Sequence, residues 1–118
     1  MSNKVNPKRG EVWWVSVNPT VGTEIEGKGS NGSRPCVVLS SNVFNNGLRT
    51  VVVAPCTTQF KDYPFRPQIN STIKPCQVAV DQMRCFDKST DRFLKKMCDL
   101  TSSELKKCLE AAQALFDS

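Results

Sequence analysis

Three short runs of β-branched and aromatic residues constrain the fold of this chain more than any other feature. The runs occupy residues 11–17 (EVWWVSV), 35–41 (PCVVLSS) and 50–54 (TVVVA). Such side chains favour pleated, half-buried strands, and the turn-forming pairs Asn18-Pro19 and Asn46-Gly47 lie between the runs. The pattern predicts three strands, with Asn46-Gly47 closing a tight hairpin into the third.

The second half of the chain predicts further strands. A long loop over residues 56–68 leads into a short strand near Ile69. Residues 77–86 (QVAVDQMRCF) alternate well enough to form one central strand, with Val78, Val80 and Gln82 on the same face. We expect one helical turn over residues 87–93 and a last short strand over residues 94–98.

The end of the chain predicts an amphipathic helix over residues 102–117. Thr101 followed by Glu104 fits a capping box. Apolar residues then recur at helical spacing, namely Leu105, Cys108, Leu109, Ala112, Leu115 and Phe116. Several short strands with a late helix predict an α+β protein that is mainly β, most simply a small, strongly bent barrel with the helix packed on it.

Length and charge bound the class of protein. The chain has 118 residues, is 39% hydrophobic and carries a formal net charge of +5, which fits a single domain over residues 1–118. No run approaches the roughly 18 apolar residues of a membrane span, and the polar start MSNKVNPKRG lacks the apolar core of a secretion signal. We expect a cytoplasmic protein with no membrane contact, whose mild positive charge permits a polyanionic partner.

Six cysteines and no histidine narrow the chemistry. Because there is no secretion signal, we predict buried free thiols rather than disulfides. Zinc binding lacks both a CxxC pair and a histidine to complete a ligand set. Cys56 is the exception among these thiols, because it lies beside a polar loop where oxidation or modification would matter.

The polar residues at strand ends remain as candidates for chemistry. Without histidine, Ser-His-Asp and Cys-His triads are excluded, and no glycine-rich phosphate motif is present. The candidates are Arg34, Thr57-Thr58 with Gln59, and Asp81-Gln82 with Arg84. An arginine fork matches a phosphate, and RNA carries its own nucleophile in the 2′-hydroxyl. RNA cleavage would therefore need only positioning and charge stabilisation, although a structural or solvated role for each residue stays open at this level.

A series of motifs, taken in order, resembles the MazF/PemK family of toxin endoribonucleases from type II toxin–antitoxin modules. The motifs are KRGEVWWVSVNPTVGTE, RPCVVLSS, VVVAPCTTQ, YPFRPQI, VAVDQMRCFDKSTDR and a closing L-T-x-x-E-L helix. The resemblance covers nearly the whole chain. It implies an SH3-like barrel that forms a homodimer, cuts single-stranded RNA at short sequences without metal or cofactor, and is neutralised by a cognate antitoxin with an acidic segment.

The same resemblance implies roles for individual residues. Arg34 falls on the family's catalytic arginine and Thr57 on its catalytic threonine. RNA contacts would come from Glu24, Thr58, Gln59, Gln82 and Arg84. The glycine- and serine-rich segment 25–33 is longer than is typical of the family, which affects the expected base preference.

Three points stay open on the sequence. The second loop carries Lys61, Tyr63, Phe65 and Arg66, which either support RNA by charge and stacking or form a barrel plug with two solvated charges. A related barrel that poisons DNA gyrase, as in the CcdB toxins, is one alternative function, although the ending LFDS does not match the ending expected of that group. A catalytically silent binding barrel is the other.

Overall fold

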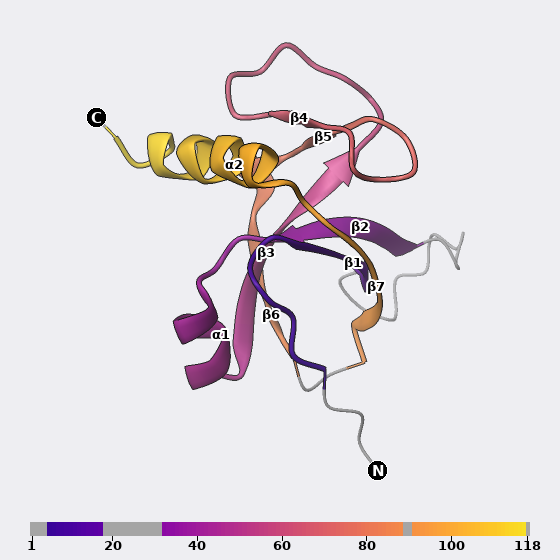
Figure 1. Cartoon of the computed structure of the whole chain (residues 1–118), viewed down its shortest axis with the longest axis vertical. Coiled ribbons are helices and arrows are strands. Elements are labelled where there is room, and N and C mark those ends of the chain that lie inside the picture. Colours follow the sequence, from indigo (N-terminus) through magenta and orange to yellow (C-terminus); the bar gives the residue numbers. More distant parts are fainter. Residues whose placement is uncertain (1–4, 18–31, 89–90, 118) are drawn as a thin grey trace.

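The computed structural model describes residues 5–17, 32–88 and 91–117. It contains one curled antiparallel sheet with strand order β4-β5-β3-β2-β1-β7, and β6 pairs with β3 off this path. The strands are β1 (Glu11–Ser16), β2 (Ser33–Val38), β3 (Thr50–Thr57), β4 (Gln68–Ile69), β5 (Cys76–Val78), β6 (Arg84–Asp87) and β7 (Phe93–Asp99). The helices are α1 (Asn42–Gly47) and α2 (Ser102–Ala114). The α+β, mainly β class is therefore confirmed (Figure 1).

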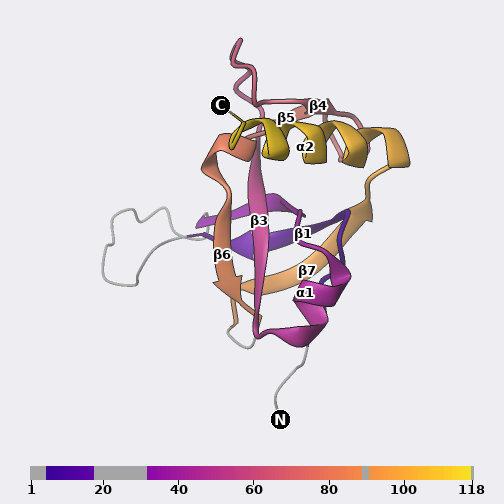
Figure 2. The same ribbon diagram turned by 90° about the vertical axis from the view of Figure 1, so that its left-hand side faces the viewer.

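Both faces of the sheet bury apolar side chains. Along β2, Cys36 and Val38 belong to one core with Val15, Val53 and Phe86. The other face packs against α2. There, Cys108 is fully buried together with core residues that include Val12, Val37, Ala54, Ile69 and Val78. Figure 2 shows α2 lying across one end of the sheet beside β4 and β5, with α1 near the opposite end. This two-sided burial explains why the strand sequences are continuous apolar runs.

Strand β3 is the central element because it pairs with three other strands. One edge pairs with β2, from Val53 to Pro55. The other edge pairs first with β6, from Thr50 to Val53, and then with β5, at Cys56 and Thr57. The change of partner falls where residues Val80–Gln82 form a short 3-10 turn.

The expected single strand over residues 77–86 is thus wrong. It is two short strands, β5 and β6, on either side of the Val80–Gln82 turn. The turn is held by the ion pair between Arg66 and Asp81, in which Arg66 Nε lies 2.7 Å from Oδ1 and Nη2 lies 3.1 Å from Oδ2. Because the strand breaks here, Asp81 and Gln82 are exposed while Val80 remains buried.

Two other expected turns differ in the structure. Residues 42–47 form α1 rather than a hairpin turn, because the Ser41 hydroxyl caps the helix by accepting from the Phe44 backbone N–H. The helical turn expected over residues 87–93 is also wrong at both ends, since Asp87 ends β6 and Phe93 begins β7. The strand expected over residues 94–98 is confirmed as part of β7.

The cysteine and helix predictions hold with exceptions. All six cysteines are free thiols, and Cys36, Cys56, Cys76 and Cys108 are buried, but Cys85 is exposed on β6. The capping box between Thr101 and Glu104 is present, yet α2 ends at Ala114, so Phe116 lies beyond it and is 80% exposed.

No helix in the described part of the chain is long and apolar enough to cross a membrane.

Glu104 joins the start of α2 to the turn between β4 and β5. Its carboxylate accepts hydrogen bonds from the backbone N–H of Thr101, Asn70 and Ser71 at 3.0, 2.6 and 3.1 Å, and from the Ser71 hydroxyl. Partial burial opposes ionisation, but these hydrogen bonds outweigh it and lower the pKa of Glu104 to about 2. The ionised carboxylate therefore stabilises the fold.

We predict that Glu104→Gln lowers the free energy of unfolding at pH 7 by about 1–2 kcal/mol, less than the full pKa shift because solvent screens the partly exposed carboxylate. Since the folded pKa is depressed, this contribution is complete above the unfolded pKa and is lost as pH falls from about 4.5 towards 2. Urea unfolding at pH 7 and at pH 3 measures it, with Glu110→Gln, exposed on the same helix, as the control. An equal deficit at both pH values would contradict the assignment.

Candidate active site

Arg34 lies at the meeting point of three hollows in the surface. It is exposed at the start of β2, where it pairs with Val15 of β1. The following residue is Pro35, which restricts Arg34 to extended backbone and so keeps it in the strand. Arg34 is among the lining residues of all three hollows. Arg34 is therefore shared by three neighbouring hollows.

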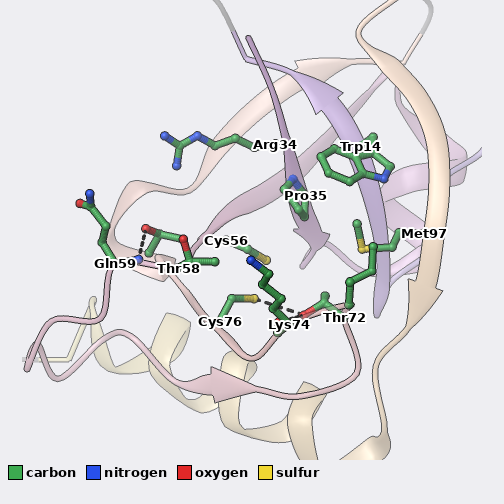
Figure 3. Close-up of a pocket in the computed structure, with 12 residues that line it drawn as sticks. Trp14, Arg34, Pro35, Cys56, Thr58, Gln59, Thr72, Lys74, Cys76 and Met97 are labelled. Atoms are coloured by element: carbon green, nitrogen blue, oxygen red, sulfur yellow. Dashed lines mark hydrogen bonds between the residues drawn. The ribbon is translucent and has the colours of Figure 1, made fainter. Parts of the chain in front are cut away.

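The largest of the three, which we name the thiol cavity, has a volume of about 490 Å³. It combines apolar side chains with hydroxyl, amide and ammonium groups (Figure 3). Its lining residues are Trp14, Arg34, Pro35, Cys56, Thr57, Thr58, Gln59, Thr72, Ile73, Lys74, Cys76 and Met97. They come from β1, β2, β3, β5, β7, the segment that follows β3 and the turn between β4 and β5.

A second hollow of about 450 Å³, the cationic cavity, shares Arg34, Thr57 and Gln59 with the thiol cavity. Its lining residues are Arg34, Pro55, Thr57, Gln59, Lys61, Tyr63, Arg66, Ala79, Asp81 and Gln82. Three of these are cations, and Asp81 is the one carboxylate among the described residues that line any of the three hollows. The arrangement favours an anionic ligand.

The small cavity, of about 150 Å³, is lined by Val17, Arg34, Cys36, Val53, Pro55, Gln82, Arg84 and Phe86. Here the Arg84 guanidinium lies over the Phe86 ring at 4.8 Å and donates to the Val17 carbonyl at 3.4 Å. Arg84 is thus held by the protein on one side and faces the hollow beside Arg34 on the other. Gln82 lines both the small and the cationic cavities.

Thr57 ends β3 with its hydroxyl in a defined orientation. Thr57 Oγ1 accepts the backbone N–H of Gln59 at 3.1 Å, a local turn that fixes the side chain. A hydroxyl oxygen that accepts a hydrogen bond keeps its own hydrogen available for donation. Among the described residues, the Thr57 hydroxyl makes no hydrogen bond as a donor. Thr57 can therefore donate to a ligand in either the thiol cavity or the cationic cavity.

Asp81 and Arg66 fix the wall of the cationic cavity instead of acting as free charges. Hydrogen bonding from Arg66 lowers the pKa of Asp81, and the Arg66 side chain is only 7% exposed and lies over the Tyr63 ring at 4.9 Å. The idea that the second loop is a plug with two solvated charges is therefore wrong for Arg66. A carboxylate with a lowered pKa is a poor proton acceptor at neutral pH, which leaves charge stabilisation as the main resource of the site.

The structure brings together most of the residues that the sequence indicated. Arg34, Thr57, Thr58 and Gln59 meet at the thiol cavity, and Gln82 and Arg84 lie on the far side of Arg34. Glu24 and most of segment 25–33 lie outside the described residues. Trp14, Thr72, Lys74 and Met97 were missed, because only the strand order brings them to the cavity.

Comparisons with known proteins agree with this picture. Residues 8–116 match the family described as the PemK-like, MazF-like toxin of type II toxin–antitoxin systems. The "Endoribonuclease toxin MazF" of Escherichia coli is 34% identical over 84 residues, which cover 71% of each chain. The "Endoribonuclease EndoA" of Bacillus subtilis is 28% identical over 119 residues, covering 93% of this chain and 97% of that protein.

Solved structures show the same fold. MazF from Deinococcus radiodurans superposes with a TM-score of 0.73 at 22% identity, covering 94% of this chain and 96% of that one. MazF of the same organism is also known in a MazE–MazF structure, which matches with a TM-score of 0.71 at 20% identity, covering 94% and 95% of the two chains. The chain belongs to the family of PemK-like, MazF-like toxins of type II toxin–antitoxin systems.

Proposed function

We propose that this protein is an endoribonuclease that cuts single-stranded messenger RNA at short sequences, without a metal ion or cofactor. The observation that carries the proposal is that Arg34 and Thr57 both line an anion-attracting cavity and a mixed apolar cavity. Relatives named endoribonucleases support it. The substrate class implies that the toxin acts in the cytoplasm. The length of the chain supports a single domain over residues 1–118.

The chemistry follows from what RNA supplies. The 2′-hydroxyl attacks the adjacent phosphorus, the bond to the 5′-oxygen of the next nucleotide breaks, and the products are a 2′,3′-cyclic phosphate and a 5′-hydroxyl. Negative charge builds on the phosphoryl oxygens as the five-bonded transition state forms. Arg34 stabilises that charge with its fork of N–H donors, and Thr57 donates a hydrogen bond that orients the phosphate.

The remaining residues bind RNA on either side of the scissile phosphate. Thr58 and Gln59 line the thiol cavity, where Trp14 offers an aromatic surface for a base. Gln82 and Arg84 lie on the opposite side of Arg34. Glu24, in the segment before β2, completes the proposed contacts to bases.

The homodimer is proposed from the family alone, and the antitoxin from the family and the charge of the site. We propose a homodimer, and an antitoxin whose acidic segment lies over Arg34 and the cationic cavity. The MazE–MazF structures from Deinococcus radiodurans support such a partner. No described feature favours gyrase poisoning, and the family match does not favour that alternative.

We predict that Arg34→Ala slows RNA cleavage by about 10²–10³-fold while leaving the folded structure intact, because one lost charge-stabilising donor costs about that much. Arg34→Lys should recover only part of the rate, since lysine lacks the planar fork. Cleavage rates with circular dichroism measure this, and Lys106→Ala, an exposed charge on α2, is the matched control. Parental rates in Arg34→Ala would reject Arg34 as the catalytic group.

Chelation should leave the activity unchanged, because the attacking group belongs to the RNA. We predict equal cleavage rates with and without EDTA, and new 3′ ends that carry a cyclic phosphate. Loss of cleavage in EDTA that is restored by a divalent ion would contradict the metal-free mechanism.

We also predict that an acidic antitoxin segment competes with RNA for the site. Binding of a synthetic acidic peptide from the cognate antitoxin should weaken at least about tenfold in Arg34→Ala and fall steeply with added salt. Peptide binding that is unaffected by the substitution and by salt would place the antitoxin elsewhere.

The proposed dimer is tested separately, by light scattering, which gives the mass of the toxin in solution.

A further inference from the structure

The thiol cavity holds two cysteines that the ribonuclease chemistry does not use. Cys56 comes from β3 and directly precedes Thr57, and Cys76 begins β5. Both are 4% exposed and both line the cavity. Figure 3 shows the two side chains in the same cavity, beside Lys74 and Thr72. Two free thiols thus lie within one cavity that also contains Arg34 and Thr57.

The strand register explains why these thiols meet. Cys56 pairs with Val78 and Thr57 pairs with Gln77 in the antiparallel β3–β5 ladder. Cys76 is two residues from Val78, so it lies on the same face of the ladder as Cys56, diagonally across from it. Both side chains line the thiol cavity on that face.

The surroundings make the two thiols unequal. Interaction with Cys76, and then burial, raise the pKa of Cys56 well above its ordinary value. The same interaction, against burial and with help from the Thr72 hydroxyl 3.5 Å from Cys76 Sγ, lowers the pKa of Cys76. Lys74 adds a positive charge to the cavity. Cys76 is therefore the nucleophilic thiol and Cys56 the neutral partner.

We propose that Cys56 and Cys76 are a peroxide-sensitive thiol pair whose disulfide closes the RNA-cleaving site. Small peroxides enter through the exposed side of the cavity, at Thr58, Gln59 and Lys74. The part of the proposal that concerns activity rests on the proposed ribonuclease function. The formation of the disulfide does not.

The reaction balances with hydrogen peroxide as oxidant. The Cys76 thiolate attacks one peroxide oxygen, the O–O bond breaks, and hydroxide leaves and takes up a proton to become water. The resulting Cys76 sulfenic acid is attacked by the Cys56 sulfur. The S–S bond forms, the S–O bond breaks, and that oxygen leaves as water with the Cys56 proton. Two thiols lose two electrons, and one peroxide becomes two waters.

Disulfide formation disturbs the site because of where the strands lie. Diagonal neighbours in an antiparallel ladder have Cα atoms about 7–8 Å apart, whereas a disulfide favours about 5.5–6 Å. Closing the bond therefore draws β3 and β5 together next to Thr57. It also moves Gln77, whose side chain holds the Lys61 backbone through hydrogen bonds of 2.8 and 2.9 Å. The bond is reversed by thiol reductants, because a bond that needs backbone movement is readily reduced.

The test treats reduced protein with a small excess of hydrogen peroxide and then blocks the remaining free thiols. Mass spectrometry of proteolytic peptides should find residues 56 and 76 in one cross-linked species, lighter by two hydrogens and cleaved by dithiothreitol. The tryptophan fluorescence, to which Trp13 and the cavity-lining Trp14 both contribute, should change with the same time course. The RNA cleavage rate should fall at least about tenfold and return on reduction.

Variants separate the proposed pair from the other thiols. For each variant, the cleavage rate after peroxide treatment is divided by the rate before it. This ratio should be near one in Cys76→Ser and in Cys56→Ala, whatever their starting rates. In Cys85→Ser, which removes the exposed thiol, the ratio should fall as it does in the parent. Absence of the cross-link, or peroxide sensitivity that persists in Cys76→Ser, overturns the proposal. A cross-link that leaves both the fluorescence and the cleavage rate unchanged also overturns it. Reduced protein that cuts no RNA contradicts the proposed function alone, because the cross-link and the fluorescence are measured without RNA.

Discussion

The change of pairing partner along β3 is the constraint on which the rest of the site depends. One edge of this strand pairs with β2, and the other pairs first with β6 and then with β5. The change requires the chain to turn at Val80–Gln82, and the Arg66–Asp81 ion pair holds that turn. It places β5 beside the end of β3, whose opposite edge pairs with β2 and so brings Thr57 close to Arg34. Hollows lined by both residues lie there. The geometry of strand pairing therefore creates the site before any side chain contributes chemistry.

Charge and hydrogen bonding then divide the surroundings of Arg34 into unlike parts. The cationic cavity gathers Arg34, Lys61 and Arg66, and its one described carboxylate is already paired. The thiol cavity is mixed, with Trp14 and Met97 beside hydroxyl and amide groups. RNA matches this division, because its phosphates need a cationic surface and the flat faces of its bases need an apolar one. The relatives named endoribonucleases support the same substrate class.

Much of the fold was predictable because local signals agreed with the final structure. The strands β1, β2, β3 and β7 follow β-branched runs, and the Thr101–Glu104 capping box marks the start of α2. Two errors had different causes, one local and one tertiary. The Ser41 cap made residues 42–47 helical although Asn46-Gly47 is typical of a hairpin. Residues 77–86 contain neither glycine nor proline, so nothing in their pattern indicated that tertiary pairing would break them into two strands.

The candidate site was predictable only in part, for a related reason. Arg34 and Thr57 stand out as polar residues at the ends of apolar strands, and the resemblance to a toxin family assigned their roles. Thr72, Lys74 and Cys76 join them only because β4 and β5 extend the sheet beyond β3, a long-range pairing that sequence periodicity does not encode.

The most direct measurement is a structure of the protein with an RNA that carries a single 2′-deoxy nucleotide at the cleavage position. This substrate binds but lacks the attacking hydroxyl. We expect the scissile phosphate to accept hydrogen bonds from the Arg34 guanidinium and the Thr57 hydroxyl, with neighbouring bases in the thiol cavity. A scissile phosphate held away from both side chains, or an RNA that is still cut at the deoxy position, would contradict it.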